Sequence, residues 1–235
     1  MMETLFVLLL PLLGTAAGAA GVFFWKGKSC RAGELLEGFA AGVMTAASVW
    51  SLLLPALEHC GGMGRLAFLP AALSLGLGGL GMLILGKNAG SGVNLTVAAV
   101  TVHNFPEGMA VGAAAAGYLA GEVSWAACLA LAVGIGVQNL PEGAIVSLPL
   151  TQTGMKRPRA FLNGLLSGVI EPVGGILTVC LAWAAIPLLP WMLAFSAGAM
   201  LWAAAELMNG KTKDGAKISY LVGFAVMMSL DVALG

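Results

Sequence analysis

The chain has 235 residues, of which 59% are hydrophobic and 9% are charged. A soluble domain carries about 25% charged residues, so the composition excludes a soluble globular protein and predicts an all-α integral membrane protein in a lipid bilayer. The formal net charge is zero, and the sequence has no basic patch that would bind a nucleic acid.

Apolar stretches of about 20 residues are long enough to cross a bilayer as helices. The sequence contains eight of them, so we expect eight transmembrane helices in a single transmembrane domain over residues 1–235. The predicted spans cover residues 4–25, 34–57, 66–86, 93–117, 123–149, 160–184, 187–208 and 218–234. The first span follows Met-Met-Glu and no basic residue precedes it, so we interpret it as a membrane helix and not as a signal peptide.

The basic residues fall almost entirely on one side of this arrangement. The connections after spans 1, 3, 5 and 7 contain ten of the eleven Lys and Arg residues, and only Arg65 lies on the other side. Because cytoplasmic loops are enriched in Lys and Arg, we expect both termini to be extracytoplasmic in a multi-pass protein of the cell (inner or plasma) membrane. The ten residues are Lys26, Lys28, Arg31, Lys87, Lys156, Arg157, Arg159, Lys211, Lys213 and Lys217.

Two internal similarities indicate repeats. His-Asn-Phe-Pro-Glu-Gly at 103–108 in span 4 matches Gln-Asn-Leu-Pro-Glu-Gly at 138–143 in span 5. A weaker match relates Phe-Ala-Ala-Gly-Val-Met at 39–44 to Phe-Ser-Ala-Gly-Ala-Met at 195–200, in spans that run in opposite directions. We therefore expect a 3+2+3 arrangement with inverted repeats, a pattern of transporters. Chance similarity of small residues is the alternative for the second match.

Four spans bring polar or sulfur-containing side chains to one depth. The midpoints fall beside Met44 in span 2, between His103 and Glu107 in span 4, about a turn before Glu142 in span 5 and beside Glu171 in span 6. Three ionised carboxylates at mid-depth cost roughly 8–10 kcal/mol, and no Lys or Arg lies there to pair with them. The three carboxyls are therefore either protonated or neutralised by one or two bound divalent cations.

The chemistry of these side chains favours a transition metal. Imidazole nitrogen together with carboxylate and amide oxygens suits Zn²⁺, Fe²⁺, Mn²⁺, Co²⁺ or Cd²⁺ better than Cu⁺, which prefers sulfur. A Mg²⁺ or Ca²⁺ site is more often all oxygen. The candidate ligands are Met44, His103, Asn104, Glu107, Gln138, Asn139, Glu142 and Glu171. For Gln138 and Asn139 interhelical hydrogen bonding is the alternative, and for Met44 it is core packing.

The prolines of the two hexapeptides add a backbone feature. Pro106 and Pro141 have no N–H to donate to the carbonyls of Val102 and Val137, so we expect each helix to kink and to free a carbonyl oxygen. Broken helices that line a hydrated midplane site are common in transporters.

Charged residues near the ends of the spans outline a route to this site. Glu58 and His59 end span 2 and Asp231 lies near the outer end of span 8, so they are candidates for an entrance. Glu206 lies near the cytoplasmic end of span 7 and is the candidate for an exit. Solvated helix ends are the alternative for all four.

The hexapeptide pair resembles the ZIP (Zrt/Irt-like) family of divalent metal transporters, in its bacterial GufA-like branch. The resemblance implies transport of Zn²⁺, Cd²⁺, Fe²⁺ or Mn²⁺ towards the cytosol, with Zn²⁺ the principal candidate, no organic cofactor, no enzymatic activity and a homodimer. Gln138 stands where the family frequently has His, which leaves the affinity and metal preference open. The alternatives are a metal-selective channel of the same architecture and an intramembrane metalloenzyme.

The resemblance also implies a binuclear midplane site. One metal would be bound by His103, Glu107, Gln138 and Glu142, with Met44 as an additional ligand. The second would be bound by Asn104, Asn139 and Glu171, with Glu107 and Glu142 bridging the two metals.

Overall fold

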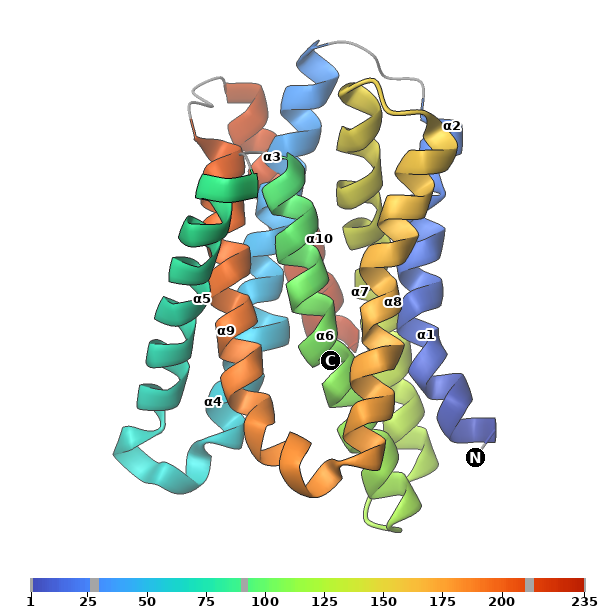
Figure 1. Cartoon of the computed structure of the whole chain (residues 1–235), viewed down its shortest axis with the longest axis vertical. Helices are drawn as coiled ribbons and strands as arrows, with labels where there is room; N and C mark the ends of the chain where they lie inside the picture. Colours follow the sequence, from blue (N-terminus) through green and yellow to red (C-terminus); the bar gives the residue numbers. More distant parts are fainter. Residues whose placement is uncertain (1, 26–29, 90–92, 210–213, 235) are drawn as a thin grey trace.

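The computed structural model describes residues 2–25, 30–89, 93–209 and 214–234, and its regular structure within those ranges is entirely helical (Figure 1). The long helices are α1 (Met2–Ala19), α3 (Cys30–Ala47), α5 (Phe68–Ala89), α6 (Val93–Leu119), α7 (Trp125–Gln152), α8 (Arg157–Cys180), α9 (Ala182–Met208) and α10 (Asp214–Leu234). The short ones are α2 (Gly21–Phe24), the π-helix η1 (Ser48–Leu53), α4 (Leu54–His59) and the 3₁₀ helix η2 (Gly61–Leu66). The prediction of an all-α protein is confirmed for these residues.

Seven stretches among the described residues are long and apolar enough to cross a membrane. Each coincides with one of the eight predicted spans. The stretches are Met2–Phe24, Gly33–His59, Phe68–Lys87, Trp125–Gln152, Arg157–Cys180, Ala182–Met208 and Asp214–Ala233. Helix α6 is not among them although it has 27 residues, because the polar residues of the first hexapeptide lower its mean hydropathy.

One predicted boundary is wrong by several residues. The sequence predicted that span 6 ends at residue 184 and span 7 begins at 187, but α8 ends at Cys180 and α9 begins at Ala182. Leu181 between them has a non-helical backbone, with φ −125° and ψ 38°. Hydropathy could not locate this turn because the apolar sequence continues through it, and Pro187 and Pro190, which would ordinarily indicate a break, lie inside α9.

The long helices that the structure describes pack as two groups of four. Helices α1, α6, α7 and α8 form one group, in which α1 lies along α7 and α6 lies along α8. Helices α3, α5, α9 and α10 form the other, in which α3 lies along α10 and α5 lies along α9. The groups meet chiefly where α9 contacts α6 and where α3 and α10 contact α7.

Glycines set the distances within each group. A Cβ at Gly143 would overlap the carbonyl oxygen of Thr15, and one at Gly108 would overlap that of Glu171. In the other group, a Cβ at Gly42 would overlap the carbonyl oxygen of Tyr220. Small residues allow membrane helices to approach this closely, which increases van der Waals contact where no hydrophobic driving force exists.

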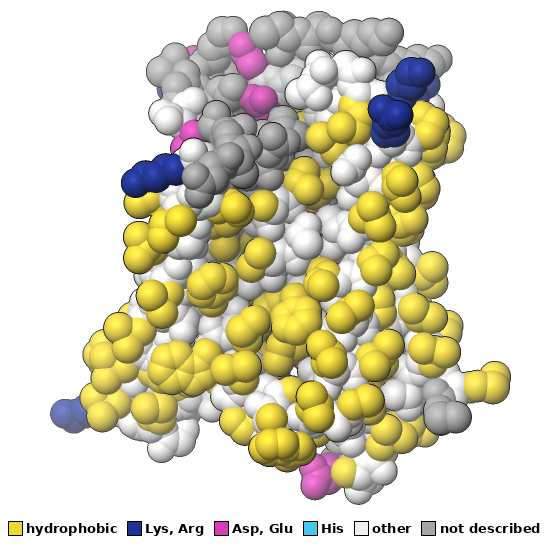
Figure 2. Space-filling model, viewed as in Figure 1, with side chains coloured by type: hydrophobic (Ala, Val, Ile, Leu, Met, Phe, Trp, Pro, Cys, Tyr) yellow, Lys and Arg dark blue, Asp and Glu magenta, His cyan; other side chains and the backbone are white. Residues whose placement is uncertain are grey.

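Charged side chains lie at the ends of the bundle and apolar ones cover its middle (Figure 2). Lys87 lies in the last turn of α5 and Arg157 begins α8, both at the upper end in Figure 1, whereas Arg65 precedes α5 at the opposite end. Arg157 also donates hydrogen bonds to the carbonyls of Phe23 and Trp25 (3.4 and 2.8 Å). The side chain of Arg31 and residues Lys26, Lys28, Lys211 and Lys213 lie outside the described part of the chain.

A pair of adjacent glycines on α5 tests the close packing. A Cβ at Gly78 would overlap the carbonyl oxygen of Phe195 on α9, whereas the nearest atom to a Cβ at Gly79 lies 3.8 Å away. We expect Gly78→Ala to destabilise the protein by about 1–3 kcal/mol through overpacking and Gly79→Ala to leave stability unchanged. Thermal unfolding in detergent measures both, and equal melting temperatures would contradict this interpretation of the α5–α9 contact.

Candidate metal centre

Each hexapeptide lies near the middle of a long helix in the same four-helix group. Residues 103–108 belong to α6 and residues 138–143 to α7, and both helices continue through the prolines Pro106 and Pro141. Glu171 lies on the neighbouring helix α8, directly before Pro172. The carbonyl of Val102, which Pro106 leaves without its helical donor, accepts a hydrogen bond from the Ser196 hydroxyl on α9 (3.1 Å).

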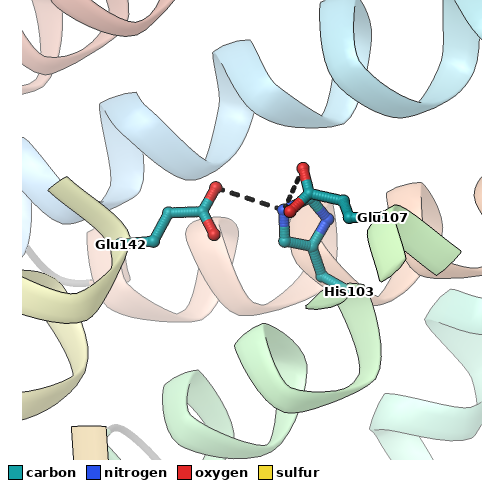
Figure 3. A group of neighbouring side chains, drawn as sticks. All are labelled: His103, Glu107 and Glu142. Carbon is teal, nitrogen blue, oxygen red and sulfur yellow. Dashed lines mark hydrogen bonds and ion pairs between the residues drawn. The ribbon is translucent and has the colours of Figure 1, made fainter. Parts of the chain in front are cut away.

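Three of the predicted ligands meet in a buried cluster (Figure 3). His103 Nε2 lies 3.2 Å from Glu107 Oε1 and 3.1 Å from Glu142 Oε1, and all three side chains are at most 2% exposed. The potential ligand atoms lie within 4.8 Å of one another. Ligands about 2.0–2.1 Å from a tetrahedral Zn²⁺ lie roughly 3.3 Å apart, so this spacing suits a bound ion without large rearrangement.

Gln138 approaches the same cluster from α7, with its amide nitrogen directed inward. That nitrogen donates to Glu107 Oε1 (2.6 Å) and to the hydroxyl of Ser51 (3.2 Å). An amide ligates a metal through its oxygen, so ligation by Gln138 requires the amide group to turn over. As arranged here, Gln138 stabilises the Glu107 carboxyl group as a hydrogen-bond donor.

The remaining predicted oxygen ligands are Asn104 on α6, Asn139 on α7 and Glu171 on α8. Asn104 donates through Nδ2 to the carbonyl of Ser167 on α8 (2.9 Å), and Asn139 donates through Nδ2 to the carbonyl of Pro11 on α1 (3.4 Å). Both amide oxygens are buried without a hydrogen-bond partner among the described residues, as is one oxygen of Glu171. Unpaired buried acceptors cost about 1–3 kcal/mol each, and a cation would satisfy several at once.

A cavity of about 660 Å³ leads from the surface to this cluster. The exposed residues Glu58 and His59 line it at the end of α4, and Glu107 and Gln138 line it beside the cluster. Asp231 also lines it and accepts a hydrogen bond from the Ser51 hydroxyl (2.6 Å). The structure thus brings the three predicted entrance residues and two predicted ligands to one cavity.

Comparison with known proteins identifies the chain. The family model described as ZIP zinc transporter matches residues 86–231. The chain is 33% identical to human zinc transporter ZIP11, with 94% of each chain covered. It is 34% identical to zinc transporter GufA of Myxococcus xanthus, covering 95% of this chain and 96% of that one. Zinc transporter ZIPB of Bordetella bronchiseptica is 36% identical over 94% of this chain and 78% of its own length.

The chain belongs to the ZIP family. The resemblance to its GufA-like branch is confirmed, and membership supports a membrane transporter of metal ions and not an enzyme.

Two other predicted site residues of this ZIP-family chain lie on helices of the other four-helix group. Met44 is fully buried on α3, in an apolar core that also includes Met200 and Leu193, so its ligation stays a prediction. Glu206 lines a separate hollow of about 320 Å³ near the end of α9. Its role as an exit residue also stays a prediction.

The sequence analysis missed two polar residues that contact the predicted ligands. Ser51 lies in the π-helix η1, whose wider turn directs the hydroxyl to both Gln138 and Asp231. Pro55 was an available signal, since it cannot donate to the carbonyl of residue 51, and π-helical turns occur frequently at functional sites. Thr15 on α1 donates to Glu171 Oε1 (3.0 Å), and no local motif indicates it.

Metal binding should stabilise the folded ZIP-family protein through this cluster. A ligand present at 100 times its dissociation constant adds about 2.7 kcal/mol, so we expect Zn²⁺ to raise the melting temperature of the wild type. Glu142→Gln should abolish this increase because it removes a buried carboxylate. Glu122→Gln, an exposed loop change, is the matched control and should retain it. An undiminished increase in Glu142→Gln would exclude Glu142 as a ligand.

Proposed function

We propose that this protein transports divalent transition-metal cations, with Zn²⁺ the principal substrate and Cd²⁺, Fe²⁺ and Mn²⁺ as further candidates, across the cell membrane towards the cytosol. The observation that supports this most is the buried cluster of His103, Glu107 and Glu142 beside a cavity that reaches the surface. One imidazole and two carboxylates provide nitrogen and oxygen ligands, the set that Zn²⁺ and its neighbours prefer.

The site is proposed to hold two metals. The first would be bound by the cluster together with Gln138 and, if it reaches, Met44. The second would be bound by Asn104, Asn139 and Glu171, with Glu107 and Glu142 bridging. The unpaired oxygens support this division, because Glu107 and Glu142 each retain one carboxylate oxygen with no partner among the described residues, beyond the one that contacts His103.

The proposed membrane arrangement has eight spans, with α6 added to the seven apolar stretches. Helix α6 has 27 residues and packs between α8 and α9, so its polar residues face protein. With the end that contains Lys87 and Arg157 in the cytoplasm, both termini are extracytoplasmic. The cavity beside Glu58 then opens to the outside, as uptake requires. The homodimer and the single domain over residues 1–235 stay predictions.

Matched close contacts support the inverted repeat. Gly143 on α7 meets the Thr15 carbonyl on α1, as Gly108 on α6 meets the Glu171 carbonyl on α8. Similarly, Gly42 on α3 meets α10, as Gly198 on α9 meets α5. In both pairs of contacts, α1 corresponds to α8, α3 to α9 and α5 to α10, with α6 and α7 exchanged. This exchange is the pattern expected of spans 1–3 and 6–8 flanking a central pair.

Transport would involve movement of one four-helix group against the other. Except for Met44, every predicted ligand lies on α6, α7 or α8, in one group, whereas Ser51, Asp231 and Glu206 lie in the other. The cavity between the groups exposes the site to one side. A shift of the ligand-bearing group would close this cavity and open a path past Glu206, which is alternating access around a fixed site.

Metal flux into proteoliposomes with a trapped indicator tests the function. We expect flux of Zn²⁺ and Cd²⁺ but not Mg²⁺ in the wild type, and its loss in a folded His103→Ala/Glu142→Ala variant, because the double change removes two of the three clustered ligands. Glu122→Gln is the control and should transport normally.

The concentration dependence separates the alternatives. Saturation and strong temperature dependence are expected of a carrier, whereas flux that rises linearly with metal concentration and follows voltage would indicate a channel. Absence of flux from well-folded wild type that still binds Zn²⁺ would contradict the proposal and favour a metalloenzyme.

Cross-linking tests the proposed movement. In a cysteine-free background, Ala113→Cys on α6 and Leu189→Cys on α9 lie on cavity walls that belong to different groups. Joining them with a bifunctional thiol reagent should stop flux. Ala114→Cys with Leu131→Cys joins α6 to α7 within one group and should leave flux intact. Normal flux through the first cross-linked pair would contradict alternating access between the groups.

A further inference from the structure

One turn of α1, from Pro11 to Thr15, contacts two of the side chains proposed to bind the second metal. The Pro11 carbonyl accepts the hydrogen bond that orients the Asn139 amide (3.4 Å), and the Thr15 hydroxyl lies 3.0 Å from Glu171 Oε1. The same hydroxyl lies 3.3 Å from the Pro11 carbonyl. Thr15 is fully buried. Two of the proposed ligands are therefore held by a helix to which the sequence analysis assigned no role.

The turn has a counterpart on α8. There the Ser167 carbonyl accepts from the Asn104 amide (2.9 Å), as the Pro11 carbonyl accepts from Asn139. Four residues after Ser167 comes Glu171, as Thr15 comes four residues after Pro11. An offset of 156 residues relates both pairs and also relates Phe39 to Phe195 in the weaker sequence match. In the proposed inverted repeat, Thr15 thus occupies the position of Glu171.

The two equivalent residues differ in chemistry and contact each other. Glu171 carries a carboxylate with one unpartnered oxygen, and Thr15 carries a hydroxyl that donates a hydrogen bond to the other oxygen of that carboxylate. A charge-assisted hydrogen bond of this kind fixes which oxygen stays free and where it points. The Thr15 hydroxyl therefore leaves Glu171 Oε2 as the oxygen available to a cation.

The surroundings keep Thr15 from moving. Gly143 lies against its carbonyl oxygen, and a Cβ at Gly168 on α8 would come within 2.8 Å of its Cβ and Cγ2. Its β-branched side chain also has few rotamers available in a helix. The hydroxyl is consequently held at a set distance from α8 before any metal arrives.

We propose that Thr15 is a positioning residue for the second metal, which it serves by holding the Glu171 carboxylate in the orientation that ligates. This inference rests on the proposed two-metal function and adds to it a residue outside the hexapeptide motifs. A partner that orients a metal ligand typically contributes 10–100-fold to metal affinity, and Thr15 should do so for one of the two metals.

Equilibrium dialysis of Zn²⁺ against the full-length detergent-solubilised protein tests the proposal. Thr15→Val keeps the shape of the side chain and removes the hydroxyl, and we expect it to weaken the second Zn²⁺ about 10-fold or more while the first binds as in the wild type. Thr15→Ser should restore the second. Thr178→Val is the matched control, because Thr178 is equally buried and bonds to the Gly174 carbonyl on α8 (2.9 Å).

A double substitution shows whether the effect passes through Glu171. Glu171→Gln should weaken binding of the second metal by itself. Adding Thr15→Val should then change the affinity little further, since the partner of the hydroxyl is already altered.

Thr15→Ala removes the same hydroxyl and replaces Thr15→Val if the latter does not fold. Wild-type affinity for two Zn²⁺ ions in the Thr15 variants would overturn the positioning role and leave the transport proposal intact. One Zn²⁺ bound by the wild type would overturn both the two-metal site and this inference.

Discussion

The rest of the structure depends on carboxylates that are buried without a cationic side chain to neutralise them. Glu107, Glu142 and Glu171 are at most 2% exposed, whereas every Lys and Arg side chain that the structure describes is exposed. The cost of burying charge is partly offset by donors: His103 for two of the carboxylates, Gln138 for Glu107 and the Thr15 hydroxyl for Glu171. One oxygen of each carboxylate keeps no partner among the described residues, and this incomplete satisfaction leaves room for a metal ion.

Close backbone packing makes this arrangement possible. Glycines let α1 lie against α7 and α6 against α8, and Gly168 on α8 leaves space for the Thr15 side chain that donates to Glu171. Gly108 and Gly143 belong to the hexapeptides themselves. The same short motif therefore contains a predicted metal ligand, a proline that lacks a backbone donor and the glycine that lets the next helix come close. In both hexapeptides the constraint on the glycine is space and not backbone conformation, since both lie inside regular helices.

Sequence reasoning could predict residues whose type alone indicates a functional site, and it missed residues whose role depends on contacts with a neighbouring helix. Glu107 and Glu142 could be predicted as site residues because a carboxylate in the middle of a membrane span is costly enough to indicate a functional site by itself. Glu58 and Asp231, predicted as entrance residues, are far apart in the chain, and both line the same cavity. The turn at Leu181 was misplaced because its residues are as apolar as the helices beside it. Ser51 and Thr15 were missed because a hydroxyl in a membrane helix usually bonds to its own backbone, as Ser147 does with Gly143.

The sequence by itself determined the membrane class, the position of most spans and the family, and it predicted the three side chains that the structure brings together, because burial of charge is so costly that its pattern is visible in composition and spacing. The tertiary structure decided which helices adjoin, which oxygens are already bonded and which remain free. It placed Gln138 with its nitrogen towards Glu107 and gave α1 a part in the site. These contacts depend on distances of about 3 Å between residues that lie 31 and 156 positions apart in the chain, and no local pattern encodes them.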